Sequence, residues 1–152
     1  MLQITKLDWV PLTCLRAAGA PSDEELTESL TRIAQTMAED MRQGRKSVTI
    51  VDMRQASALS ASQRRNCSIW MKQHVERFAQ TSYGTAFAIE SPLVRGVLTA
   101  LLWFQPIDVP HEVVRDLDSA VRWAIKRFEA ARVVVPERLR TELGRVFEND
   151  IA

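Results

Sequence analysis

Apolar residues follow two different periods along the chain, and each period predicts a different kind of element. Nearly continuous runs of apolar and β-branched residues occupy 48–53 and 85–89, while apolar and polar residues partly alternate over 3–18. Continuous runs are typical of parallel strands covered on both faces, and alternation is typical of strands with one exposed face. The pattern predicts an opening hairpin with its turn at 8–11, two central strands, and a short last strand at 112–115.

Apolar residues at helical spacing fill the intervals between these predicted strands. A capping-box pattern that starts at Ser22 precedes an amphipathic helix at 22–43, and a second helix is expected at 61–80. Asp116 or Asp118 caps a fourth helix, which ends before the Val-Val-Val-Pro stretch. Helices therefore alternate with strands through most of the chain.

The third predicted helix, at 92–104, is apolar on almost every side. It begins with Ser91 and Pro92, which are residue types favoured at the cap and at the first helical position. A simple surface helix has one apolar face, so something must cover this one. The sequence leaves three candidates for that cover, namely the C-terminal helix, a ligand or a second subunit.

A fifth predicted helix, at 136–147, carries a single apolar stripe. The stripe is made by Leu139, Leu143, Val146 and Phe147, and the rest of the segment is largely polar. One interpretation is a helix that docks on the domain, and the other is a helix that binds a second copy or a partner. The sequence leaves both open.

The order of these elements predicts one α/β domain. Strands that alternate with helices require right-handed crossovers and a mostly parallel sheet. We therefore expect a sheet of about five strands with an N-terminal hairpin, four connecting helices and a C-terminal helix. The expected division is a domain at 1–133 and a C-terminal helical extension at 134–152.

Four stretches of the chain resemble a bacterial family of stand-alone SpoIIAA-like proteins, whose fold is shared by STAS domains. The stretches are Val51-Asp-Met-Arg54, Ser62-Gln-Arg-Arg65, Ser91-Pro-Leu-Val-Arg-Gly96 with Trp103 after it, and Ala120-Val-Arg-Trp123. The resemblance implies a SpoIIAA-like (STAS-like) fold and a non-catalytic regulatory or scaffolding module that binds a protein partner.

The resemblance also implies a candidate site for phosphorylation. In the anti-sigma-factor antagonists of this fold, a Ser at the start of the second helix is phosphorylated, in a pattern such as Asp-Ser-Ser-Gly. The corresponding stretch here reads Leu59-Ser-Ala-Ser-Gln63, which contains Ser60 and Ser62 but neither the Asp nor the Gly. A Ser at this position can equally serve only as the helix cap.

A candidate partner-binding surface lies where the two central strands end. We expect the partner to bind through 54–65, which spans the loop expected at 54–61 and the start of the second helix and contains Ser60, Ser62 and Arg64. Arg95, at the start of the third helix, completes the surface. Ligands of open α/β sheets bind at the carboxyl ends of the strands, so we expect these residues to converge on one acidic partner or anion. The alternative is that both Arg side chains are solvated or paired within the chain.

Large apolar side chains suggest a different function, the binding of a small apolar ligand or lipid in a pocket under the third helix. The residues that would line it are Trp70, Met71, Trp103 and Phe104. Aromatic and Met side chains at helical spacing more often pack an ordinary core, and that interpretation stands beside the ligand pocket.

Composition and charge narrow the classes of function. The 152 residues carry 20 Lys and Arg against 19 Asp and Glu, a net charge of +1 that does not favour nucleic acid. The apolar run at 96–104 is about half of a membrane span, and the start of the chain lacks the pattern of a secretory signal, so we expect a cytoplasmic protein. A structural zinc site needs about four ligands, and the chain holds only four Cys and His residues combined, with no CxxC or CxxH spacing, so no metal is expected.

No sequence motif of a known catalytic site is present, and no cofactor is expected. Glycine-rich phosphate loops and the GxSxG and HExxH patterns are missing from the sequence. Cys67 and His74 lie about 10 Å apart along a helix, too far for a nucleophile and its base. A hydrolase with a scattered site is therefore the least favoured hypothesis, and a homodimer is an open one.

Overall fold

A five-stranded sheet forms the middle layer of the computed structural model, which describes residues 1–149. The strands are β1 (Leu2–Lys6), β2 (Leu12–Gly19), β3 (Ser47–Ala56), β4 (Ser82–Ala88) and β5 (His111–Val114), and they lie in sequence order across the sheet. Only β1 is antiparallel to its neighbour, because a tight turn joins it to β2. The predicted α/β fold with an N-terminal hairpin is confirmed.

The central strands β3 and β4 are direct neighbours, as the sequence predicts. They pair in parallel, with Val51 opposite Phe87 and Asp52 opposite Ala88. The segments that follow the two strands therefore leave the sheet at the same edge. β3 also runs on to Ala56, so the loop expected at 54–61 is shortened to residues 57–60.

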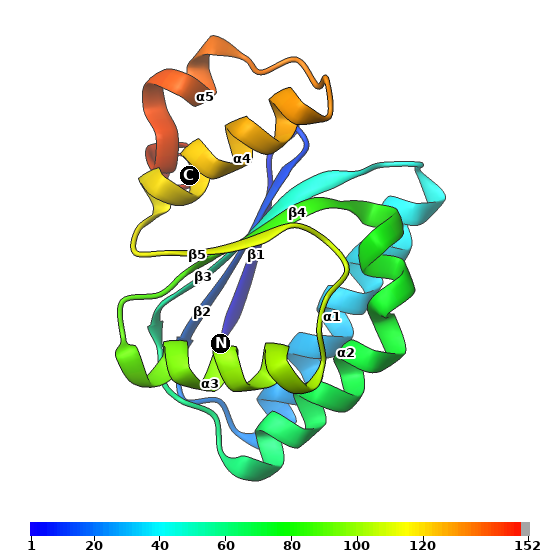
Figure 1. The fold of residues 1–152 in the computed structure, drawn as a ribbon, viewed down its shortest axis with the longest axis vertical. Coiled ribbons are helices and arrows are strands. Elements are labelled where there is room, and N and C mark those ends of the chain that lie inside the picture. Colours follow the sequence, from blue (N-terminus) through cyan, green and yellow to red (C-terminus); the bar gives the residue numbers. More distant parts are fainter. Residues whose placement is uncertain (150–152) are drawn as a thin grey trace.

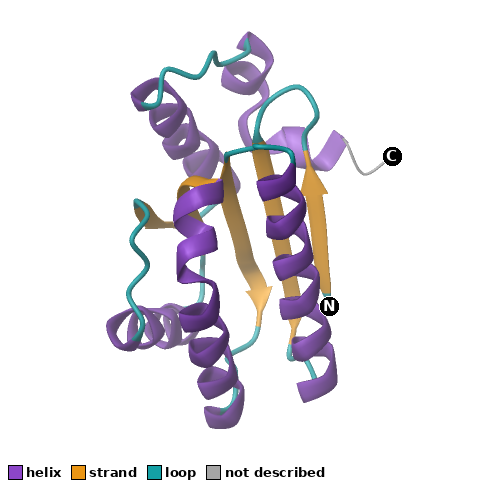
Figure 2. Ribbon diagram, turned by 90° about the vertical axis from the view of Figure 1, so that its right-hand side faces the viewer, coloured by secondary structure: helices purple, strands orange, loops and turns teal. Residues whose placement is uncertain are grey.

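Helices cover both faces of the sheet (Figure 1). The crossover helices α1 (Asp23–Arg42), α2 (Ala61–Thr81) and α3 (Pro92–Phe104) lie on one face. The other face carries α4 (Leu117–Ala130) and the C-terminal segment, which consists of α5 (Glu137–Glu142), η1 (Leu143–Arg145) and α6 (Val146–Asn149). Figure 2 shows α1 and α2 side by side along the sheet. The molecule thus has three layers, with the sheet in the middle.

Polar side chains at the helix starts explain where the helices begin. Ser22 and Glu25 form the predicted capping box of α1, and Ser60 forms a second one with Gln63 at α2. Ser91 caps α3, and Asp116 rather than Asp118 caps α4. Each of these side-chain oxygens accepts a hydrogen bond from a backbone N–H that the helix itself cannot satisfy.

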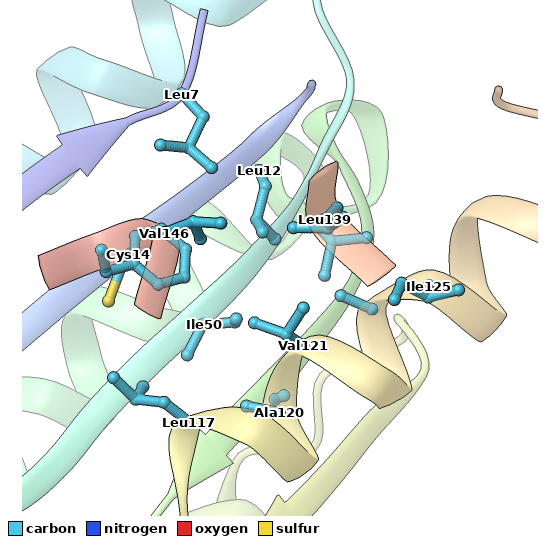
Figure 3. Close-up of a cluster of buried hydrophobic side chains, with 14 of the residues drawn as sticks. Leu7, Leu12, Cys14, Ile50, Leu117, Ala120, Val121, Ile125, Leu139 and Val146 are labelled. Atoms are coloured by element: carbon cyan, nitrogen blue, oxygen red, sulfur yellow. The ribbon is translucent and has the colours of Figure 1, made fainter. Parts of the chain in front are cut away.

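The larger hydrophobic core lies between the sheet and α4 (Figure 3). Alternate residues of the strands point to this face, and the inward face of α4 packs on them. The fully buried side chains from the two layers include Leu12, Val48, Ile50, Val121 and Phe128. A smaller cluster on the opposite face joins Phe87 and Ile89 to Val94 and Leu98 of α3.

The C-terminal segment differs from the single helix predicted at 136–147. It breaks at Leu143, whose φ is +50°, because Gly144 packs against Leu117 and donates its N–H to Asp118 Oδ1 at 3.0 Å. The break lets Val146 and Phe147 reach the core beside α4, where both are buried.

The segment that docks beside α4 leaves α3 uncovered. It lies on the face of the sheet opposite α3, so the idea that the C-terminal helix covers the third helix is wrong. Leu93, Trp103 and Phe104 of α3 are 68%, 84% and 85% exposed. Only Val94 and Leu98 of this helix are buried in the described part of the chain.

Replacing Gly84 of β4 by alanine should lower the free energy of unfolding by about 1–3 kcal/mol, because the site is already full. A Cβ at this position would lie 2.7 Å from the Trp123 ring and 2.9 Å from the Pro110 carbonyl oxygen. Urea denaturation measures the effect. Gly96→Ala is the matched control, since a Cβ there meets nothing within 4 Å and alanine favours the helix. Equal stability of the two variants would contradict the packing argument.

Candidate functional site

Charged side chains surround an open pocket at the carboxyl ends of β4 and β5. The pocket has a volume of about 690 Å³ and lies between the start of α3 and the start of α4. Its lining includes two basic residues, Arg95 and Arg115, and two acidic ones, Glu90 and Asp116. Ligands of parallel α/β sheets bind at this edge, so the pocket is the best candidate for a recognition site.

A buried ion network lies in the neighbouring strands. Asp52 of β3 is only 2% exposed, and its carboxylate accepts hydrogen bonds from Arg16 Nε at 3.0 Å and Arg54 Nε at 2.9 Å. Arg54 Nη2 and the Arg54 backbone N–H also donate to this carboxylate. Asp52 thus holds the side chains of two strands, β2 and β3, in fixed positions.

The pKa values of these groups show that the network is ionised. Burial by itself raises the pKa of Asp52, but the hydrogen bonds and charge of Arg54 outweigh it and hold that pKa below its usual range. The same hydrogen bond raises the pKa of Arg54, and the charge of Glu90 adds to the shift. Arg54 also helps to lower the pKa of Asp116, which is set mainly by the hydrogen bond from the Ser119 N–H. The buried network is therefore coupled electrostatically to two acidic residues of the pocket.

Ser60, Ser62 and Arg64 lie together at the start of α2. Ser60 Oγ accepts from the Gln63 N–H at 3.2 Å and lies 3.1 Å from Ser62 Oγ. The Gln63 side chain is buried and also donates to the Pro21 carbonyl and to Asp23, which ties the start of α2 to α1. Ser60 thus caps the helix, while both Ser side chains are exposed.

The two predicted Arg residues have different surroundings. Arg95 is exposed, lines the pocket and donates to the Ile89 carbonyl at 3.3 Å. Arg64 is half-buried and donates to the Leu59 carbonyl at 2.8 Å, and it is not among the residues that line the pocket. Asp52, which could have paired with Arg64, pairs with Arg16 and Arg54 instead. The convergence of Arg64 and Arg95 on one anion stays a prediction.

Sequence reasoning missed Arg115 and the buried network. Arg115 follows directly after the last strand, so the rule that placed Arg95 at a strand end would have found it. The sequence did not indicate the network of Arg16, Asp52 and Arg54. Arg16 comes to lie opposite Asp52 only through the pairing of β2 with β3.

The four residues of the predicted apolar pocket lie on two helices and differ in exposure. Trp103 and Phe104 are almost fully exposed, whereas Trp70 and Met71 are half-buried on α2. Trp70 stacks on His74, with ring centroids 4.5 Å apart, and meets Phe78 edge-on. None of the four lines the charged pocket.

The cysteines and histidines of the described residues belong to no group of side chains that could hold a metal ion. Burial raises the pKa of Cys14 to about 12, with the charge of Asp52 adding to the effect, so the thiol is protonated at neutral pH. His74 Nδ1 contacts the Trp70 carbonyl, and His111 Nδ1 contacts that of Val109. Within residues 1–149, no three metal-binding side chains are grouped to hold an ion. None of the helices described there is both long enough and apolar enough to cross a bilayer.

Comparison with known proteins identifies the fold but no close relative. No known family profile matches the chain, and no curated protein sequence does. An uncharacterised DUF3478-family protein with a SpoIIAA-like fold, from Shewanella loihica PV-4, is 14% identical with a TM-score of 0.59; the match covers 82% of this chain and 92% of that one. The anti-sigma-factor antagonist SpoIIAA in its unphosphorylated form is 16% identical with a TM-score of 0.56, and the match covers 90% and 100%.

Both similar structures have the sheet and helix arrangement that the resemblance implied. At these sequence identities the similarity is one of fold. It does not extend the activity of either protein to this chain. Together with the order and register of the five strands, it shows that this chain has the SpoIIAA-like (STAS-like) fold.

Proposed function

We propose that this protein is a non-catalytic regulatory module that binds a protein partner at the carboxyl ends of β3, β4 and β5. The observation that carries the proposal is the open pocket whose lining combines Arg95 and Arg115 with Glu90 and Asp116. One of the similar structures is an anti-sigma-factor antagonist, which is compatible with a regulatory role of this fold. The location in the cytoplasm, the bacterial source and a homodimer remain predictions from the sequence.

The mixed charge of the pocket favours a protein partner over a simple anion. Two carboxylates on the pocket wall would repel a phosphate or a dicarboxylate that approached the two Arg side chains. A protein surface carries both signs of charge and can match both pairs. Arg side chains are also frequent among the few residues that dominate the binding energy of protein interfaces.

The hydroxyl groups at the start of α2 extend the proposed surface. Ser60 and Ser62 are exposed where the loop that follows β3 meets α2. In the sheet, β3 is the neighbour of β4. Ser60 Oγ already serves the capping box, so Ser62 is the hydroxyl better placed to contact a partner or to accept a phosphate. Arg64 would add a positive charge on the following turn.

Charge reversal at Arg95 should abolish partner capture, because it replaces one of the two cations of the pocket by a third carboxylate. Proteins captured from a lysate of the source cells by the wild type, by Arg95→Glu and by Trp103→Ala would be quantified by mass spectrometry. An interface Arg of the dominant class contributes about 2 kcal/mol or more, so Arg95→Glu should reduce capture roughly 30-fold or more.

The Trp103→Ala variant tests whether the partner binds at the apolar end of α3 rather than at the charged pocket. Trp103 is 84% exposed, so Trp103→Ala removes a large side chain without disturbing the core. Partner binding that survives Trp103→Ala and fails with Arg95→Glu supports the proposal. The reverse result would move the interface to α3, and capture that neither variant reduces would refute an interface at the pocket.

A further inference from the structure

A second cavity, of about 210 Å³, lies between the sheet and the first halves of α1 and α2, which are the two long helices of Figure 2. The sheet and α1 supply most of its wall, with the side chains of Leu15, Val51, Met53, Leu26, Leu30 and Ile33. The cavity is separate from the charged pocket, with which it shares no lining residue.

Apolar side chains form most of the wall of this cavity. No charged side chain lines it, and its polar side chains are those of Ser29, Ser57 and Cys67. The N-terminal ammonium of Met1, also a lining residue, is exposed and donates to the Ala18 carbonyl at 3.1 Å. An ordered water needs two to four polar partners, so most of this space is unfavourable for water. The cavity is partly open to solvent, and an apolar molecule that enters it would remove apolar wall from contact with water, which is favourable.

We propose that this cavity is a binding site for a small uncharged apolar molecule, such as a single aromatic ring or a short alkyl chain. Its volume suits a ligand of about six to ten non-hydrogen atoms. A helix of a partner protein is roughly 10 Å across and does not fit. This site is distinct from the charged pocket around Arg95, although Ser57 and Leu59 of its wall lie just before Ser60 of the proposed partner surface.

Cys67 provides a chemical reporter inside the cavity. It is half-buried in the cavity wall, and burial raises the pKa of its thiol, so alkylation is expected to be slow and best followed at mildly alkaline pH. The second cysteine, Cys14, is 2% exposed and belongs to the core on the other face of the sheet. Its alkylation requires the fold to open, so a Cys67 rate well above the Cys14 rate shows that Cys67 reacts in the folded protein.

The experiment uses toluene as the probe and benzoate as a charged analogue of similar size. Alkylation of each cysteine by iodoacetamide is followed by peptide mass spectrometry, and the melting temperature is measured in parallel. With toluene at about ten times its dissociation constant, only the empty fraction reacts, so alkylation of Cys67 should slow about tenfold. Toluene should also raise the melting temperature, and benzoate should do neither.

Matched variants test whether the effect arises in this cavity. Ser29→Leu fills it from α1, where leucine favours the helix, and it should remove both effects of toluene. Gln35→Leu makes a similar change at an exposed position of the same helix, outside the cavity, and should leave both effects intact. Ala17→Leu fills the cavity from the sheet side and replaces Ser29→Leu if that variant fails to fold.

Three results would overturn the proposal. The first is a wild-type melting temperature and Cys67 rate that toluene leaves unchanged. The second is an effect of benzoate as strong as that of toluene, and the third is a response of the filled variants like that of the wild type. Loss of partner binding in Arg95→Glu has no bearing on this test, because Arg95 lies outside the cavity.

Discussion

Asp52→Ala should lower the free energy of unfolding by about 3–5 kcal/mol, the loss expected when one partner of a buried ion network is removed. The carboxylate is almost completely buried and accepts hydrogen bonds from Arg16 and Arg54. Without it, two guanidinium groups lose their partner and repel each other in a poorly solvated position. Urea denaturation at neutral pH measures the effect.

Asp108→Ala is the matched control for this variant. Asp108 is exposed in the link between α3 and β5, and its removal should change the free energy of unfolding by less than about 0.5 kcal/mol. Comparable losses in Asp52→Ala and Asp108→Ala would show that the network does not stabilise the fold.

The stabilisation by Asp52 should also depend on pH. Its pKa is lower in the folded protein than the value of about 3.9 expected in the unfolded chain. The contribution is therefore fully present above the unfolded pKa and is lost as the pH falls through the folded pKa. The stability difference between the wild type and Asp52→Asn should shrink in acid, and a difference that stays constant down to the pH of acid unfolding would contradict this assignment.

Phe147→Ala should cost about 3–5 kcal/mol of unfolding free energy, because it leaves a cavity in the main core. Phe147 is 1% exposed and packs in the same cluster as Phe128, Leu139 and Val146. This cluster is where the C-terminal segment docks, so the variant tests that docking directly. Denaturant unfolding of the full chain is the measurement.

Phe104→Ala is the matched control, because it makes the same substitution outside the hydrophobic core. Phe104 is 85% exposed at the end of α3, and its replacement should change stability by less than about 0.5 kcal/mol. If the two variants were equally stable, the C-terminal segment would not dock on α4 in solution. The alternative in which this segment serves a second copy or a partner would then regain support.

The local pattern of the sequence was enough to predict the elements and their order. Capping residues such as Ser22 and Ser60 act within a few residues of their partners, so their helices could be located without the fold. The β-branched runs likewise predicted β3 and β4 as neighbours, because parallel strands joined by one helix commonly pair. A stripe of apolar residues also predicted that the C-terminal segment has one face to bury.

The tertiary structure decided which distant residues meet. The sequence could not place Arg16 against Asp52, since they are 36 residues apart and come together only through the register of β2 and β3. It could not show that α3 stays exposed, because that depends on which face of the sheet the C-terminal segment covers. The periodicity of the sequence shows which side of a helix or strand is apolar. Which element packs against that side depends on how the sheet and both layers of helices pack together.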